Sequence, residues 1–173
     1  MNILCSIAAS AIIGLTSMFN MAIPTELTPS QLENGLLYEL KPLAEDFTEI
    51  EEDYGINSAM YASVVALESD WGRSYLSKSK NNVTSYTCSS GYKSYQSKAE
   101  SLYDMAENLS ENYLKEEGKY FGGSTSIDDV ACYYLTGKPR CKMNWNEQQQ
   151  VKQYSDLVKQ IYQQILRRAA RGE

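Results

Sequence analysis

The chain contains no histidine among its 173 residues. This absence excludes the Ser-His-Asp and Cys-His arrangements of nucleophilic hydrolases, and it excludes zinc sites that need histidine ligands. The four cysteines include no pair at C-x-x-C spacing, so a structural zinc site is not expected either. We therefore expect no metal and no cofactor. Among hydrolytic chemistries, glycoside cleavage driven by carboxylates remains the natural candidate.

Basic residues are also few, because 16 lysines and arginines face 22 aspartates and glutamates, for a net charge of −6. No basic stripe is visible, so we expect no nucleic-acid partner. Arg167, Arg168 and Arg171 gather where the last predicted helix ends, and there they complement the helix dipole. The length fits a single domain with enough chain to bury a core. We expect that domain to act as a monomer.

Charge is absent from the whole beginning of the chain, since no charged residue precedes Glu26. Residues 3–23 are weakly apolar, and Pro24 follows them as a turn signal. An export signal or membrane anchor is the functional interpretation, and a buried amphipathic helix is the alternative. The lack of a basic start and of a clear cleavage site counts against a signal peptide. We favour export or anchoring, with residues 1–24 as leader or membrane contact and 25–173 as the catalytic domain. The chain would then be secreted or held in the cell envelope.

After Thr25 the apolar residues recur mostly with helical spacing. Helix starts are predicted by capping patterns at 28–31, 97–100 and 144–147, and a buried helix by the apolar run at 58–69. Between residues 75 and 96 this spacing gives way to serines, threonines and tyrosines. Two short runs there, 83–88 and 92–96, predict a small β-hairpin or an ordered loop. The fold class is therefore mostly α with one small β excursion. Farther on, Cys132 and Cys141 are near enough in sequence to form a disulfide.

The segment Ala66-Leu67-Glu68-Ser69-Asp70-Trp71-Gly72 is the most informative one in the chain. Glu68 falls in the last turn of the predicted buried helix, which Asn57 caps at its start and Gly72 is expected to end. Burial and the negative end of the helix dipole both raise the pKa of a carboxyl group. A carboxylic acid kept protonated near neutral pH can protonate a departing sugar oxygen. The alternative is a glutamate that simply reaches solvent as the helix ends.

The order Glu68-Ser69-x-Trp71-Gly72-x-Ser74, then Asn81-Asn82, then Gly91-Tyr92 to Tyr95-x-Ser97 resembles the glucosaminidase domains of glycoside hydrolase family 73. These bacterial and phage enzymes cut the glycan strands of peptidoglycan on a lysozyme-like α fold. The resemblance extends from about residue 27 to about residue 165. It implies an endo-β-N-acetylglucosaminidase whose partner is peptidoglycan.

Position by position, the resemblance implies that Glu68 is the general acid. Trp71 matches a tryptophan that shapes the end of the catalytic helix, although a core aromatic is an equally good interpretation. Asn82 matches the second of the family's paired asparagines. Tyr134 matches a tyrosine that lines the cleft, with a core tyrosine as the alternative. The family pattern continues Asn-Asn-Leu-Phe-Gly-Ile, whereas here residues 81–86 read Asn-Asn-Val-Thr-Ser-Tyr.

The serines and tyrosines of residues 85–97, Tyr86 and Tyr95 among them, suit sugar binding because aromatic faces stack on pyranose rings. An exposed hairpin rich in tyrosine is the alternative. Many members of the family are thought to supply a second acid from this region, but no Asp or Glu lies between Arg73 and Ala99. Asp70 points to another helix face, and Glu100 fits a capping role.

We therefore expect a mechanism with one carboxylate, in which polar groups hold the water or the substrate itself assists. A muramidase or a lytic transglycosylase remains an alternative on the same fold. A wall-binding domain without activity is the alternative outside enzymes.

Overall fold

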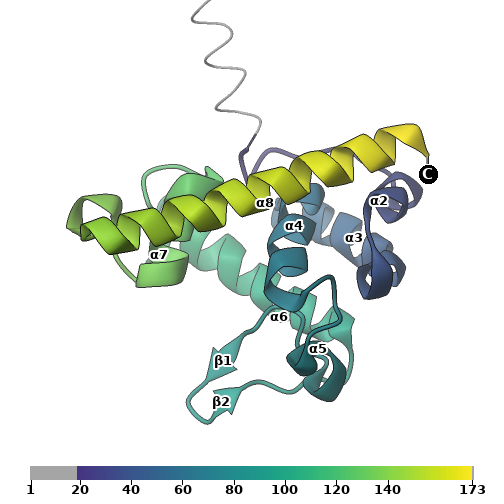
Figure 1. Ribbon diagram of the computed structural model, residues 1–173, viewed down its shortest axis with the longest axis horizontal. Coiled ribbons are helices and arrows are strands. Elements are labelled where there is room, and N and C mark those ends of the chain that lie inside the picture. The colour runs from purple at the N-terminus through teal and green to yellow at the C-terminus, as the bar shows by residue number, and fades with distance from the viewer. Residues whose placement is uncertain (1–18, 173) are drawn as a thin grey trace, which may run out of the picture.

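The computed structural model describes residues 19–172, which form a helical domain with one two-stranded antiparallel hairpin (Figure 1). This confirms the predicted fold class. In chain order the elements are α2 (Pro29–Gly35), η1 (Tyr38–Leu43), α3 (Ala44–Tyr54), α4 (Ser58–Ser69), α5 (Tyr75–Lys80), β1 (Thr87–Cys88), β2 (Gly91–Tyr92), α6 (Lys98–Leu109), η2 (Ser110–Leu114), α7 (Ile127–Thr136), η3 (Arg140–Lys142) and α8 (Trp145–Arg171).

Helix α4 forms the centre of the domain, and almost all of its residues are buried. The long helix α8 crosses the domain and packs against α2, α4 and α7, while α3 and α6 pack together beneath (Figure 1). A helix that is apolar on all sides is stable only when neighbours cover every face. The apolar run at 58–69 therefore fixes α4 as the buried helix, and its last turn points toward the hairpin region.

Local sequence signals explain where most helices begin and end. Thr28 and Asn144 each form a reciprocal capping box with the residue three positions later, as predicted. At the start of α6 the box is altered, because Ser97 accepts from the Glu100 N–H while the Glu100 carboxylate accepts from the backbone N–H of Gln96. Glu100 still satisfies a free N–H at the helix start, so its capping role is confirmed through a different donor.

The end of α4 differs from the prediction that Gly72 stops it. Asp70 is the C-cap with φ +50°, and Trp71 and Gly72 follow with φ +56° and +82°. A Cβ at Gly72 would lie 2.8 Å from the Cβ of Glu39, so glycine allows the chain to pass close to η1. Three consecutive left-handed residues turn the chain sharply and lead it into α5, a short helix that the polar composition did not predict.

The hairpin is smaller than the runs predicted for residues 83–88 and 92–96. Thr87 pairs with Tyr92 and Cys88 with Gly91, and the flanking residues form an ordered loop instead of longer strands. The loop is held by the side chain of Asn82, which replaces the strand hydrogen bonds that a longer hairpin would make.

The residues before Thr25 that the structure describes belong to the folded domain. Met21 is fully buried, its N–H donates to the Thr125 carbonyl, and its own carbonyl accepts from the Asn57 N–H. The predicted boundary at residue 24 therefore cuts through a packed segment, and the folded part begins no later than Phe19. Residues 1–18, which hold most of the predicted leader or anchor, lie outside the described residues.

Cys132 and Cys141 do not form the disulfide that their spacing allowed. Both are free thiols, Cys132 buried on α7 and Cys141 exposed on η3. The Cys132 thiol instead lies 3.2 Å from the carbonyl of Asp128, one helical turn earlier. Within residues 19–172, no helix combines the length and the apolar character needed to cross a membrane.

Candidate active site

Glu68 lies in the last turn of α4, as predicted, and its side chain is partly buried instead of escaping to solvent. The Tyr154 hydroxyl, presented by α8, donates a hydrogen bond to Glu68 Oε1 at 2.9 Å. The Tyr134 hydroxyl from α7 lies close enough to the same carboxyl group to influence its pKa. Three helices far apart in sequence therefore meet at one carboxyl group.

The electrostatics of Glu68 favour its protonated form. Burial is the largest influence and raises the pKa of the Glu68 carboxyl, while the hydrogen bond from Tyr154 and the nearby hydroxyls of Tyr134 and Ser85 oppose the shift in part. The rise follows the direction predicted from the apolar helix. The two tyrosines remain neutral donors, because burial and the neighbouring carboxylate raise the pKa of each.

Two hollows open beside Glu68, and each is lined by several of its neighbours. One, of about 330 Å³, is bordered by the loop at 84–87, by α6 and by Tyr134. The other, of about 430 Å³, is bordered by Leu67, by the end of α7 and by the α8 residues Gln150, Gln153, Tyr154 and Leu157. We call them the loop hollow and the helix hollow. Glu68 and Leu135 line both, so the two hollows adjoin at these residues.

The loop hollow depends on Asn82, which is 1% exposed. Its amide donates to the carbonyls of Tyr86 and Lys93, and its Oδ1 accepts from the N–H groups of Thr84 and Tyr86. The buried Asn82 side chain therefore holds the loop in its shape. The loop in turn brings the Ser85 hydroxyl to 3.3 Å from the Glu68 carbonyl and places Tyr86 on the hollow. Direct contact between Asn82 and a substrate is not supported by this geometry.

The structure brings Tyr86 and Tyr134 to the hollows, but it places Trp71 and Tyr95 elsewhere. Trp71 packs on the core, and the guanidinium carbon of Arg168 lies 5.7 Å from its ring centroid. The Tyr95 hydroxyl donates to Asp104 at 2.6 Å. Both residues therefore support the surrounding structure, and neither lines a hollow beside Glu68.

Glu68 is the one carboxylate among the described residues that line the two hollows. Asp70 forms an exposed ion pair with Arg73 at 2.8 Å, and Asp104 forms one with Lys93 at 2.7 Å. Both acids are therefore engaged away from the hollows. No group of three or more potential metal ligands occurs in the part of the chain that the structure describes.

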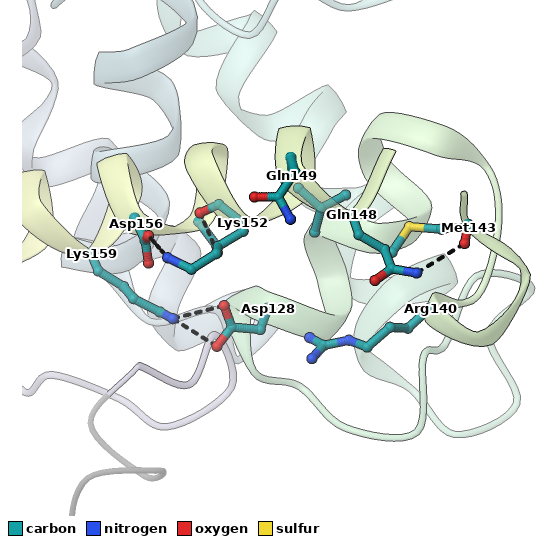
Figure 2. A pocket seen from close by; sticks show the side chains of 10 residues that line it. Asp128, Arg140, Met143, Gln148, Gln149, Lys152, Asp156 and Lys159 are labelled. Atoms are coloured by element: carbon teal, nitrogen blue, oxygen red, sulfur yellow. Dashed lines mark hydrogen bonds and ion pairs between the residues drawn. The ribbon is translucent and has the colours of Figure 1, made fainter. Parts of the chain in front are cut away.

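A separate hollow of about 380 Å³ lies between α7 and α8, on residues of α8 other than those that line the helix hollow (Figure 2). Its charged side chains are paired: Lys159 with both oxygens of Asp128 at 2.7 Å, and Lys152 with Asp156. Arg140 lies 3.5 Å from Asp129. The Lys159–Asp128 pair joins α8 to α7, and each of the other charged side chains of this hollow also has a partner of opposite charge.

A buried helix that ends in a protonatable glutamate beside two hollows is the arrangement that carboxylate-dependent glycosidases use. Comparison with known families agrees. The sequence model of the glucosaminidase family, described as mannosyl-glycoprotein endo-beta-N-acetylglucosaminidase, matches residues 44–167. The chain belongs to this family, and it is a glycosidase that acts on peptidoglycan as an endo-β-N-acetylglucosaminidase. A search of curated proteins finds no match to the chain.

Sequence reasoning missed Tyr154 and Leu135 as members of the site. The helical spacing of the last helix places Tyr154 on its inward face, but its partner across the core was not foreseeable. A hydroxyl within an otherwise apolar helical stripe was the available signal, because buried polar groups need partners. Leu135 gave no signal, since an apolar residue in an amphipathic helix is ordinarily core.

Proposed function

We propose that Glu68 is the general acid of this glucosaminidase. The observation that carries the proposal is its partly buried carboxyl group, hydrogen-bonded by Tyr154 and placed beside two adjoining hollows. A strand of sugars that occupies both hollows would pass directly over this carboxyl. Because its pKa is raised, the Glu68 carboxyl group can hold the proton that a leaving sugar oxygen needs.

In the proposed reaction Glu68 donates its proton to the glycosidic oxygen as the bond from the anomeric carbon to that oxygen breaks. Water then bonds to the anomeric carbon and returns a proton to Glu68, so that the acid is regenerated. Among residues 19–172, no second carboxylate lines the hollows. We therefore propose that the attack on the anomeric carbon is assisted by the substrate's own acetamido oxygen or by a water molecule that protein hydroxyl groups hold in place. Tyr86 and Tyr134 are the proposed sugar contacts.

The peptidoglycan substrate places the action of this protein outside the cell or in its envelope. We propose that the chain is exported, in a bacterial or phage-encoded setting, and that it acts as a monomer. Fractionation of expressing cells tests the export, and sedimentation tests the monomer. Recovery of active protein only from the cytoplasm would contradict the proposed export.

The test of the acid is Glu68→Gln, a nearly isosteric change that removes only the proton donor. We expect release of new reducing ends from purified wall to fall by about 10²–10⁴-fold, with the fold retained. Glu100→Gln is the matched control, because this exposed glutamate caps α6 and glutamine can still accept from the Gln96 N–H. Full activity in a folded Glu68→Gln protein would refute the assignment.

The bond that is cut is tested by mass spectrometry of the digest. We expect fragments with N-acetylglucosamine at the reducing end. Reducing muramic acid would indicate a muramidase and anhydro-muramic ends a lytic transglycosylase. Wall binding without any cleavage by the purified protein would indicate an inactive binding domain.

A further inference from the structure

Leu135 occupies an unusual place for an apolar residue. It lies in the last turn of α7, directly after Tyr134, and its side chain is 42% exposed. It is also the one residue besides Glu68 that lines both the loop hollow and the helix hollow. A second exposed leucine, Leu157 on α8, lines the helix hollow alone. Exposed apolar side chains that border a concave site mark surfaces that a ligand covers.

The chemistry of the two hollows differs, and neither is cationic. The loop hollow presents hydroxyl and amide groups from Thr84, Ser85 and Asn108. The helix hollow presents leucines with the neutral amides of Gln150 and Gln153. Among residues 19–172, those that line the two hollows include no lysine or arginine.

Lys93 is a cation beside the loop hollow, and its charge is already paired. Lys93 Nζ lies 5.3 Å from the centroid of the Tyr86 ring, and it forms an ion pair with Asp104 at 2.7 Å. A carboxylate on the substrate would therefore meet no lysine or arginine among the described residues that line these hollows, and it would meet the carboxyl of Glu68. Stem peptides of peptidoglycan carry carboxylates. The glycan to which they are attached is neutral, because its lactyl carboxyl groups are held in amide bonds to the peptides, and it offers hydroxyls, acetamido groups and apolar ring faces.

We propose that Leu135 is a specificity-determining residue that contacts the sugars on both sides of the cleaved bond, in a groove that recognises the neutral, acetylated glycan and not the stem peptide. The proposal rests on the proposed function, because it takes Glu68 to mark the cleaved bond. Methyl groups of acetamido substituents and the apolar faces of the sugar rings cover Leu135 when the strand is bound. The hydroxyls of the loop hollow bind the polar edges.

Leu135→Ala tests the role of this side chain. Because Leu135 is exposed, we expect the variant to keep its melting temperature, while kcat/KM on glycan strands stripped of peptide falls about tenfold. Leu135→Met, which restores most of the apolar contact, should recover most of that loss. Ile23→Ala is the matched control, since Ile23 is 44% exposed but lies outside both hollows. An unchanged kcat/KM in Leu135→Ala would overturn the proposal.

A binding measurement separates this proposal from the proposed function. In the Glu68→Gln background, which removes turnover, we expect the added Leu135→Ala change to weaken binding of stripped strands by about tenfold. This result would support the groove whether or not Glu68 is the acid. Equal binding with and without Leu135→Ala would overturn it. Full activity of Glu68→Gln alone would overturn the assignment of the acid and the placement of the cleaved bond beside Leu135, but not the groove itself.

The peptide is tested with strands from one wall preparation, uncross-linked and either peptide-bearing or stripped, with the lactyl carboxylates that stripping frees converted to neutral amides. We expect kcat/KM values within about threefold of each other and little change with added salt, since no ion pair to the substrate is screened. A preference above about tenfold for peptide-bearing strands that disappears at high salt would show that charges on the peptide are recognised, and it would overturn the proposal.

Discussion

Removing the Tyr154 hydroxyl tests how the candidate acid is controlled. The hydroxyl donates to Glu68 Oε1 at 2.9 Å, and the Tyr154 ring packs on Tyr134 with centroids 5.9 Å apart. Tyr154→Phe deletes the donor and leaves the ring, so the packing of α8 on α4 and α7 should survive. The change therefore isolates one hydrogen bond to the carboxyl group.

The direction of the effect follows from the protonation state that the bond favours. A hydroxyl donor stabilises the ionised carboxylate more than the protonated one, and here it opposes the rise that burial causes in the pKa of Glu68. Without it, that pKa should rise further. Since the basic limb of the pH profile of kcat/KM reports the essential acid of the free enzyme, this limb should move to higher pH.

The magnitude follows from the same contact. A hydrogen bond to a charged group contributes about 1.5–3 kcal/mol, and the Tyr134 hydroxyl remains close to the carboxyl group, so we take the lower end. That value corresponds to about a tenfold loss of kcat at the pH optimum, because the acid is less firmly oriented. Tyr133→Phe is the control, since Tyr133 is on α7 next to Tyr134 but lines neither hollow. A basic limb that stays in place or moves to lower pH in Tyr154→Phe would refute the reasoning.

Two further predictions concern stability. Burial raises the pKa of Glu68, so its contribution to stability is fully present below the unfolded-state pKa and declines as the pH rises through the folded-state pKa. Glutamine stays neutral at every pH, so the melting temperature of Glu68→Gln should exceed that of the wild type by a margin that grows from acid to neutral pH. Scanning calorimetry measures this margin, which amounts to about 2–4 °C per kcal/mol. A margin that shrinks as the pH rises would contradict the prediction. Met21→Ala should lower the free energy of unfolding by about 2–5 kcal/mol in denaturant titrations, because Met21 is fully buried, whereas the exposed Ile23→Ala should change it little; equal effects would show that this segment is not core.

The sequence by itself determined the helical framework. The apolar run at 58–69 required burial on every side, and the caps at Thr28, Asn57 and Asn144 specified where their helices start. These signals are local, since they depend on residues within a turn or two of one another. For the same reason Glu68 was identifiable as a carboxyl at the end of a buried helix, with its pKa raised.

Only the tertiary structure decided what surrounds that carboxyl. Tyr154 reaches Glu68 from 86 positions along the chain, and no local pattern specifies which buried hydroxyl meets which acid. The fold likewise gives Asn82 and Tyr95 supporting roles. The Asn82 amide donates to carbonyls of the loop, and the Tyr95 hydroxyl donates to Asp104. It also exposed Leu135, which its helical spacing alone would assign to the core. Spacing along the chain predicts the face that a residue occupies, whereas the packing of α4, α7 and α8 determines what that face meets.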